Sequence, residues 1–328
     1  MTSKVLVISG GDVLKCFPMR KAIEIMRSAF SDLSNQVNSI PQRTILQMPH
    51  QNADGLVMPI YSSKEKRFSI KVAAINRDNP SNNLPLIHSI LMLFNSVTGE
   101  PLAIVDAKTI TGIRTGAATG LATDLLARRD SSVAAIFGAG VQARYQLEAL
   151  CNVRKIKHVQ LFNLKPERSK SFITEMGNKF NIKIEIVTNI SELKKADIIC
   201  TATSSKSPLF EDKDIVKGTH INAIGSYKPD EREIPSLTVK RAKVVVDSIS
   251  SCLKEAGDII IPIKEGIYKK ENIYAELGEI INGKLNPRED DNEITLFKSV
   301  GNAAQDLSSA IYIFSKAKVL GLGIEVDL

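Results

Sequence analysis

The residues best suited to chemistry lie near the middle of the chain, where Gly138, Gly140 and Ala143 form a G-x-G-x-x-A pattern in SSVAAIFGAGVQARYQLEAL. The first glycine permits a tight turn, the second allows the backbone to approach a pyrophosphate, and the small third residue lets a helix pack closely on a strand. A helix that begins at such a turn also presents free amides and the positive end of its dipole. Because an apolar run precedes the pattern and helical spacing follows it, we interpret it as a dinucleotide-binding turn rather than a purely structural one.

The residues that would meet the adenosine ribose come about 20 positions further on. An acid there would accept a hydrogen bond from the 2′-hydroxyl of NAD, but this chain has Asn163, followed by Lys165 and Arg168 in FNLKPERS. A neutral residue with two nearby cations suits a 2′-phosphate, so the sequence predicts NADP(H) as the preferred cofactor, with NAD(H) possible. The alternative is that Lys165 and Arg168 are solvated surface charges.

The elements that must position this turn follow an α/β pattern from residue 131 onward. Apolar strand-like runs alternate with helical segments: SVAAIF, HVQLFNL, KIEIV, IICTAT, THINAIG and AKVVVDS are the strand candidates, and NISELKKAD is expected to be a capped helix between two of them. Such alternation predicts a parallel, doubly wound sheet with right-handed crossovers.

The first 110 residues have a different pattern. One amphipathic helix is expected over 18–34, and the strand-like runs QRTILQMP, GLVMPIYS, FSIKVAAIN and HSILMLFNSVTGEPLAIVD follow it, with SVTGEP as a hairpin turn. This predicts an antiparallel α+β segment with its own core. A long helix rich in small residues, over 107–129, then leads into the central turn. The expected fold class is therefore α/β, a Rossmann-type doubly wound domain joined to an α+β domain.

Composition excludes several classes of protein. The 328 residues are 43% hydrophobic and 24% charged, and no apolar run is long enough to span a membrane. The net charge of +7 does not predict nucleic-acid binding, because acidic and basic residues alternate, as in LKKADI and KPDEREI, which we interpret as solvated surface, and aromatics are only 5%. Four scattered cysteines are expected to be reduced thiols in a cytoplasmic protein, and four scattered histidines offer no metal site.

Residues 100–150 resemble the ornithine cyclodeaminase/mu-crystallin family. The resemblance extends over nearly the whole chain through RTILQMP, KVAAINRDNP, THINAIGS, AELGEIINGKLNPREDDNEITLFKSVG and NAAQD. It implies a homodimer whose leading domain supplies both dimer contacts and substrate-binding groups. On this basis we expect a substrate-binding and dimerisation domain over 1–115 with 305–328, and an NAD(P)-binding Rossmann domain over 116–304.

The resemblance also implies that Arg43, Lys71 and Arg114 bind the carboxylate of an amino- or imino-acid substrate. The chemistry agrees, because a planar guanidinium binds a carboxylate in a fixed fork. Lys71 and Arg114 lie among apolar or small residues, where an unpaired charge is costly. We expect both to be catalytic as well as substrate-binding, and internal salt bridges are the alternative for all three cations.

Further positions match family segments near the dinucleotide. They are Thr115, Gly138, Ala139, Gly140, Val141 and Gln142, then Thr201, Ala202, Thr203 and Ser204, and finally Val300, Gly301 and Asn302. Asp306, in NAAQD, is expected to cap or orient a helix rather than to act in catalysis.

One departure from the family pattern bears on the reaction. Cyclodeaminases carry an aspartate two positions after the glycine of the IG strand end, whereas this chain has Tyr227 there. A phenol is neutral at pH 7 and a poor partner for the ammonium of ornithine, although it can still contact substrate. We therefore expect an NADPH-dependent reductase of cyclic ketimines such as Δ1-pyrroline-2-carboxylate or Δ1-piperideine-2-carboxylate. An amino-acid dehydrogenase of the alanine type, an ornithine cyclodeaminase and a non-catalytic ligand-binding protein like mu-crystallin are the alternatives.

Overall fold

The computed structural model describes residues 4–328 and divides the chain into two compact units. Unit 1 comprises Met1–Arg114 and Ala303–Leu328, and unit 2 comprises Thr115–Asn302. The bounds expected from the sequence lie within one or two residues of these. Arg114 and Thr115, on either side of the division, are neighbours in a single helix, α3 (Ala107–Leu126).

Unit 1 is built on a mixed sheet in the order β16-β1-β7-β6-β5-β4-β2, with β3 paired to β4. Its pairs are antiparallel except for β1 with β7. The hairpin turn predicted at SVTGEP joins β6 to β7, with Gly99 at φ +77°. The strands are β1 (Lys4–Ile8), β2 (Asn38–Ser39), β3 (Thr44–Met48), β4 (Ala53–Ser62), β5 (Arg67–Asn76), β6 (Ile87–Asn95), β7 (Pro101–Asp106) and β16 (Ile324–Asp327).

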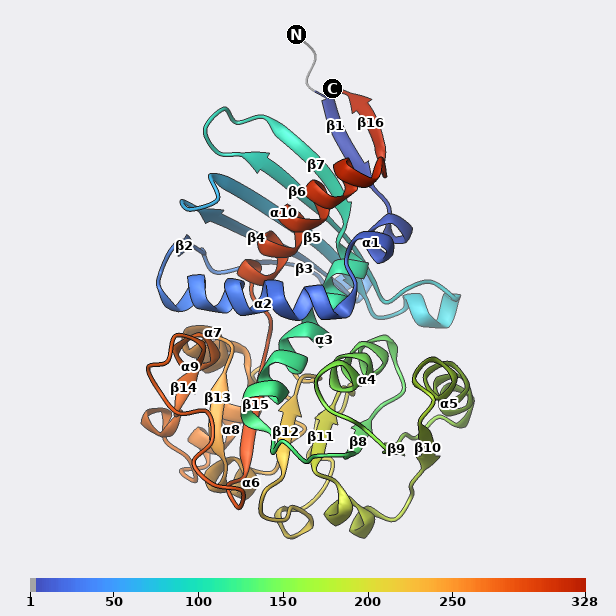
Figure 1. Cartoon of the computed structure of the whole chain (residues 1–328), viewed down its shortest axis with the longest axis vertical. Coiled ribbons are helices and arrows are strands. Elements are labelled where there is room, and N and C mark those ends of the chain that lie inside the picture. The colour runs from blue at the N-terminus through green and yellow to red at the C-terminus, as the bar shows by residue number, and fades with distance from the viewer. Residues whose placement is uncertain (1–3) are drawn as a thin grey trace. The chain divides into compact units, whose positions relative to one another are not determined.

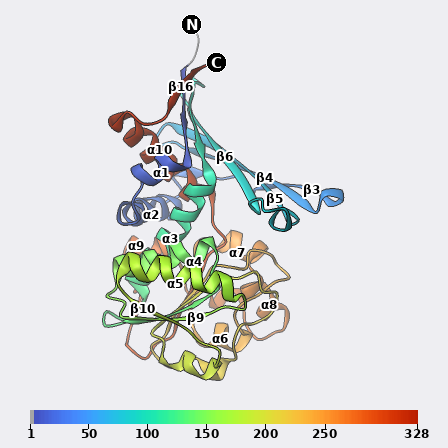
Figure 2. The same ribbon diagram turned by 90° about the vertical axis from the view of Figure 1, so that its right-hand side faces the viewer.

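Helices cover one face of this sheet. Helix α2 (Met19–Ser34) buries its apolar stripe against α10 (Ala303–Leu320), and α10 also packs on β4, β5 and β6. Figures 1 and 2 show α2, α10 and the shorter α1 (Gly10–Cys16) on the same side of these strands. Alternate residues of β5 face the helices and are buried, among them Ser69, Lys71 and Ala73. The strand period of two therefore places Lys71 on the covered face.

Unit 2 contains a fully parallel sheet in the order β10-β9-β8-β11-β12-β15-β13-β14. The strand order reverses between β8 and β11, which is where ligands bind in doubly wound folds. This confirms the predicted fold class. The strands are β8 (Val133–Phe137), β9 (His158–Phe162), β10 (Lys183–Ile186), β11 (Ile198–Thr201), β12 (His220–Ala223), β13 (Lys243–Val246), β14 (Ala275–Glu276) and β15 (Thr295–Lys298).

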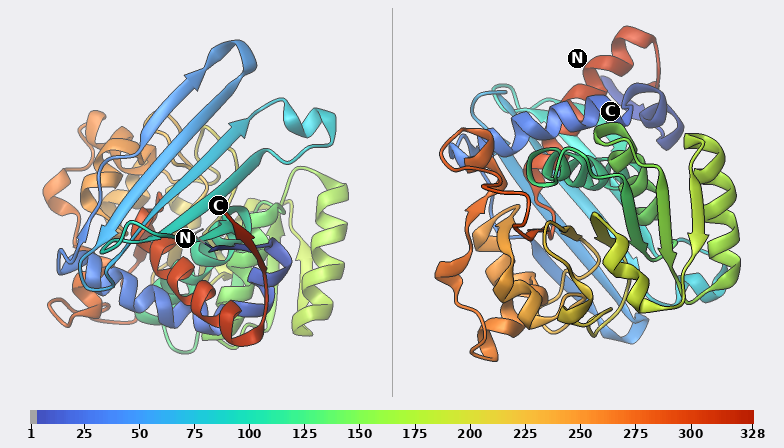
Figure 3. Two further views of the ribbon diagram at one scale, coloured as in Figure 1. Left: turned by 90° about the horizontal axis from the view of Figure 1, so that it is seen from above. Right: turned by 60° about the horizontal axis from the view of Figure 1, so that its bottom comes forward.

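Two hydrophobic cores lie on the two faces of the parallel sheet. One joins Ile136 of β8 to Leu147 of α4 and Phe172 of α5, and the other joins Phe137 to Val239 of α6 and Ile259 of α8. Figure 3 shows α4 and α5 along β8, β9 and β10. The helices are α4 (Val141–Val153), α5 (Pro166–Phe180), α6 (Ser236–Arg241), α7 (Ile249–Glu255), α8 (Gly257–Lys264) and α9 (Leu277–Ile281).

One expected element has a different form. Residues 189–197 were expected to be an α-helix, but the structure has a 3-10 segment over Ile190–Lys195. The predicted cap is present, since the Asn189 side chain accepts a hydrogen bond from the amide of Ser191. The segment is six residues long and has the tighter 3-10 hydrogen bonding, which is typical of short connecting helices. No helix within residues 4–328 is long and apolar enough to cross a membrane.

Candidate functional site

Unit 1 holds a buried cluster of two cations on one carboxylate, contributed by β5, α3 and α10. Lys71 Nζ donates to Asp306 Oδ2 at 2.6 Å, and Arg114 Nε donates to Asp306 Oδ1 at 3.2 Å. Arg114 Nη1 donates to Gln305 Oε1 at 2.6 Å. The exposed fractions are 4% for Lys71, 6% for Arg114 and 1% for Asp306. The predicted alternative of internal salt bridges is thus present for Lys71 and Arg114.

The cluster nevertheless carries a surplus positive charge. Lys71 and Arg114 together bring two charges, and Asp306 neutralises one of them. The Nη2 atom of Arg114 takes no part in the bonds described above. A buried net charge favours a bound anion, and a free guanidinium nitrogen favours one with an oxygen acceptor.

Electrostatics within the cluster shift two pKa values in the directions that its geometry predicts. Burial lowers the pKa of Lys71 to about 8; the charge of Asp306 opposes this, while those of Arg114 and Arg43 add to it. Burial would raise the pKa of Asp306, but the charges of Lys71 and Arg114 outweigh it and hold the pKa below its usual value. Lys71 therefore has a proton that it can exchange near neutral pH. Arg43, partly exposed just before β3, is close enough for its charge to act on Lys71.

Asp306 was expected to cap or orient a helix, but from the first turn of α10 it instead holds two side chains in place. It does so through ion pairs with residues 235 and 192 positions away rather than by capping a helix.

In unit 2, the glycine turn lies between β8 and α4, as its motif requires. Gly138 has φ +95°, and a Cβ added there would lie 2.8 Å from the carbonyl oxygen of Ala202, at the end of neighbouring β11. At Gly140, which caps α4, a Cβ would meet no atom within 4 Å. The Arg144 guanidinium donates to the carbonyls of Ala139 and Gly140 at 2.8 and 3.1 Å and holds the turn in shape.

The turn fits the pyrophosphate of a dinucleotide. No side chain caps the first amides of α4, and Val141 is 63% exposed at its start. Oε1 of Gln142 is buried and accepts no hydrogen bond within residues 4–328. Open space above Gly140, uncapped amides and an unsatisfied acceptor are what an anionic ligand with hydroxyl donors would use. Thr115, in α3, is nearly buried at 8% exposed.

The segment expected to meet the ribose follows β9. Asn163 Nδ2 donates to the carbonyl of Lys165 at 2.7 Å and to Ser169 Oγ at 2.9 Å, so its amide nitrogen is occupied by the loop itself. Its Oδ1 atom is not used in these bonds. Lys165 and Arg168 are both exposed, at the beginning of α5. Both remain accessible to a phosphate, and the preference for NADP(H) stays a prediction.

The two remaining cofactor segments follow β11 and β15. Thr201 is buried, Ala202 and Thr203 are half-buried, and Ser204 is exposed. Of the second segment, Val300 is half-buried, whereas Gly301 and Asn302 are buried. The amides of Val300 and Gly301 donate to Asp247 Oδ2 at 3.0 and 2.7 Å. Tyr227, in the loop after β12, is 40% exposed and available for contact.

A group of buried charged residues in unit 2 was missed by the sequence analysis. Glu233, Asp258 and Lys298 are each 0% exposed. The interpretation of KPDEREI as solvated surface is therefore wrong for Glu233, because mixed charge along the sequence does not show which side chains turn inward. The one available signal was Lys298 at the end of an otherwise apolar strand. Within residues 4–328, no group of three or more His, Cys, Asp or Glu side chains is placed to hold a metal ion.

Comparison with known proteins shows the family of this chain. The model of the ornithine cyclodeaminase/mu-crystallin family matches residues 4–320. The chain belongs to this family. A curated relative, Delta(1)-pyrroline-2-carboxylate reductase from Bacillus cereus, is 37% identical, and the match covers 98% of this chain and all of the relative.

Two solved structures resemble the whole chain closely. Delta(1)-pyrroline-2-carboxylate reductase of Thermococcus litoralis, in complex with NADH and L-proline, has a TM-score of 0.95 and 41% identity, over 98% of this chain and 100% of the other. An archaeal alanine dehydrogenase, described as a dimer with bound NAD, has a TM-score of 0.92 and 30% identity, over 98% and 99% of the two chains.

Proposed function

We propose that this family member is an NAD(P)H-dependent oxidoreductase that reduces the C=N bond of cyclic ketimines, converting Δ1-pyrroline-2-carboxylate or Δ1-piperideine-2-carboxylate to proline or pipecolate. The observation that carries the proposal is the buried surplus of positive charge formed by Lys71, Arg114 and Asp306. It suits a substrate with one carboxylate, and every substrate of this class has one. The relatives from Bacillus cereus and Thermococcus litoralis bear the name of the same reaction.

The chain's own groups have distinct roles in this proposal. Arg114, fixed through Nε and Nη1, binds and orients the substrate carboxylate with its remaining donor, and Arg43 adds positive charge from the β3 side. Lys71, with its pKa near 8, binds the substrate carboxylate or donates a proton to the imine nitrogen. The reduced nicotinamide, when bound, supplies the hydride. No nucleophilic serine or cysteine is needed.

The cofactor assignment has two candidates. Lys165 and Arg168 support NADP(H), because both are exposed at the N-terminal end of α5 beyond Asn163. NAD(H) is the second candidate, because the solved relatives contain NADH and NAD and Asn163 Oδ1 could accept from a ribose hydroxyl.

The partner in this proposal is a second copy of the chain. The face of the unit 1 sheet away from α2 and α10 exposes Val57, Val72 and Ile90, between 36% and 47%. An exposed apolar face of this kind is typical of an oligomer interface. The archaeal alanine dehydrogenase relative is a dimer. Light scattering coupled to size exclusion tests this, and a monomer at micromolar concentration would contradict it.

Steady-state assays distinguish the proposed reaction from its alternatives. NADPH and NADH oxidation is measured with each cyclic imine, and separately with pyruvate plus ammonia. We expect turnover with the cyclic imines and no dependence on ammonia. Ammonia-dependent turnover of pyruvate would favour the alanine dehydrogenase alternative, and ammonia release from ornithine would favour cyclodeaminase. Binding without turnover across the panel would favour the mu-crystallin-like alternative.

The double variant Lys165→Ala/Arg168→Ala addresses cofactor choice. We expect the KM for NADPH to rise while that for NADH stays near its original value. The matched control is Lys157→Ala/Lys183→Ala, which removes two cations at the amino ends of β9 and β10, whereas Lys165 and Arg168 follow the carboxyl end of β9. Equal changes in both KM values would contradict the assignment of NADP(H).

A further inference from the structure

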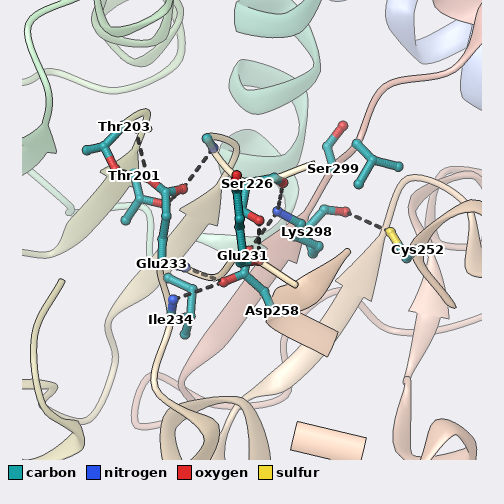
Figure 4. A network of polar contacts seen from close by, with 12 residues as sticks. Thr201, Thr203, Ser226, Glu231, Glu233, Ile234, Cys252, Asp258, Lys298 and Ser299 are labelled. Carbon is teal, nitrogen blue, oxygen red and sulfur yellow. Dashed lines mark hydrogen bonds and ion pairs between the residues drawn. The ribbon is translucent and has the colours of Figure 1, made fainter. Parts of the chain in front are cut away.

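Glu233 lies completely buried and receives four hydrogen bonds from the segments that follow β11 and β12 (Figure 4). Its Oε1 accepts from the amide of Thr203 at 2.8 Å and from Thr203 Oγ1 at 2.7 Å. Its Oε2 accepts from Thr201 Oγ1 at 2.7 Å and from the amide of Gly225 at 2.8 Å. The carboxylate therefore joins two loops that are 22 residues or more apart in sequence, using both oxygens fully.

The arrangement requires a carboxylate rather than an amide. Each oxygen faces one backbone N–H, which can only donate, and one hydroxyl, which can rotate. A glutamine would place an NH2 group against the amide of Thr203 or of Gly225, and a buried donor would then lack an acceptor. Gly225 is adapted to the same contact, because a Cβ there would lie 2.5 Å from Glu233 Oε1 and 2.4 Å from the carbonyl of Thr203.

A buried ion pair connects Glu233 to the end of β15. Asp258 Oδ1 accepts from the amides of Glu233 and Ile234 at 2.7 and 2.9 Å, and its Oδ2 accepts from Lys298 Nζ at 2.7 Å. Lys298 Nζ also donates to the carbonyl of Ser226 at 2.5 Å. Figure 4 shows this chain of contacts running from Thr203 through Glu233 and Asp258 to Lys298.

The segments held in this way are those that the sequence assigns to the ligands. Residues 201–204 and 300–302 were predicted to contact the dinucleotide, and Tyr227 the substrate. Glu233 holds the first segment directly, Lys298 holds the loop of Tyr227 through Ser226, and the 300–302 segment begins two residues after Lys298. None of the three charged side chains has any exposed surface of its own.

We propose that Glu233, Asp258 and Lys298 are positioning residues that fix the loops after β11 and β12 in the conformation that binds the nicotinamide dinucleotide, with Glu233 as the central member. The inference rests on the proposed function for the identity of the ligand. The inference adds these three residues to the glycine turn and to the substrate-binding cations as determinants of ligand binding. It also predicts that loosening Glu233 weakens cofactor binding without removing any group that touches the cofactor.

The test compares Glu233→Gln with Asp197→Asn in the full-length protein. Asp197 is the control carboxylate at the amino end of β11, the strand whose carboxyl end contacts Glu233, and its Oδ2 accepts from the amides of Ser132 and Val133 at 2.8 and 3.0 Å. Dissociation constants for NADH and NADPH are measured by fluorescence without any imino acid, together with Tm and amide hydrogen exchange over 201–205. Because no substrate is present, an error in the proposed imine reaction does not change this outcome.

We expect Glu233→Gln to raise the cofactor Kd by about ten-fold or more, the effect of losing one or two hydrogen bonds to a charged group, and to speed exchange at 201–205. Asp197→Asn should lower Tm while leaving Kd unchanged. Glu233→Asp keeps the charge but is one methylene shorter, and it should raise the cofactor Kd by a smaller factor. This variant provides the test if Glu233→Gln does not fold. An unchanged Kd in a folded Glu233 variant, or an equal rise in Asp197→Asn, would overturn the inference.

Discussion

Replacing Asp306 by asparagine separates the charge of this residue from its shape. In the wild type, the carboxylate lies 2.6 Å from Lys71 Nζ and raises the pKa of an amine that burial holds near 8. Even in the dielectric of water, two unit charges 2.6 Å apart attract by about 1.6 kcal/mol, which corresponds to a pKa change of about 1.2. The buried position makes this a lower bound, so the pKa of Lys71 should fall below about 7.

The sign of the expected effect on activity follows from the protonated form of Lys71. If charged Lys71 supports imine reduction, kcat/KM decreases as pH rises through its pKa, and Asp306→Asn moves this alkaline limb to lower pH. The assay is kcat/KM for the cyclic imine between pH 6 and 9.5. The pKa of the substrate imine is the same for every variant, so the difference between profiles reports on the protein.

Two variants accompany the Asp306 experiment. Asp32→Asn removes a carboxylate 2.9 Å from Lys64 on the surface of unit 1 and should not move the limb. Lys71→Arg keeps a charge whose pKa exceeds about 12, so it should move the limb upward, and it provides a second test if Asp306→Asn does not fold. An alkaline limb that stays in place in both Lys71→Arg and Asp306→Asn would refute the role assigned to Lys71.

Three other substitutions test particular contacts. Arg114→Lys keeps the charge but loses the guanidinium donor Nη2, and we expect KM for the imine to rise about ten-fold or more with cofactor Kd unchanged. An unchanged KM would remove Arg114 from the substrate site. Gly138→Ala, at φ +95°, should cost about 1–3 kcal/mol of unfolding free energy and weaken cofactor binding, whereas Gly99→Ala, also at positive φ but in open space, should leave binding intact. Gly116→Ala should lower the free energy of unfolding by about 1–3 kcal/mol, measured by chemical denaturation, because its Cβ would lie 2.5 Å from the carbonyl oxygen of Tyr145. A stabilised variant would contradict this and would mean that helix propensity outweighs the close contact.

Several features could be predicted from the sequence because they depend on residues close together in the chain. The glycine turn was identifiable from Gly138 and Gly140 between an apolar run and a helical pattern, and the structure has a strand, a turn at positive φ and a helix there. The hairpin at SVTGEP and the helix over 18–34 were predicted for the same reason. The alternation of apolar runs and helical segments from residue 131 onward predicted the doubly wound sheet.

Other features were decided only by the tertiary structure. Lys71 and Asp306 are 235 residues apart, and no local pattern indicates that a strand and a helix bring them together. Glu233 lies in a run of alternating charges that resembles solvated surface, yet it is buried because two loops supply four donors to it. The sequence by itself indicated the glycine turn, because side-chain chemistry and short-range spacing are local properties, and its resemblance to the family predicted that Arg43, Lys71 and Arg114 bind an acid. Which charges are buried, and what compensates them, depends on long-range packing, because the cost of burying a charge is set by the partners that the fold brings to it.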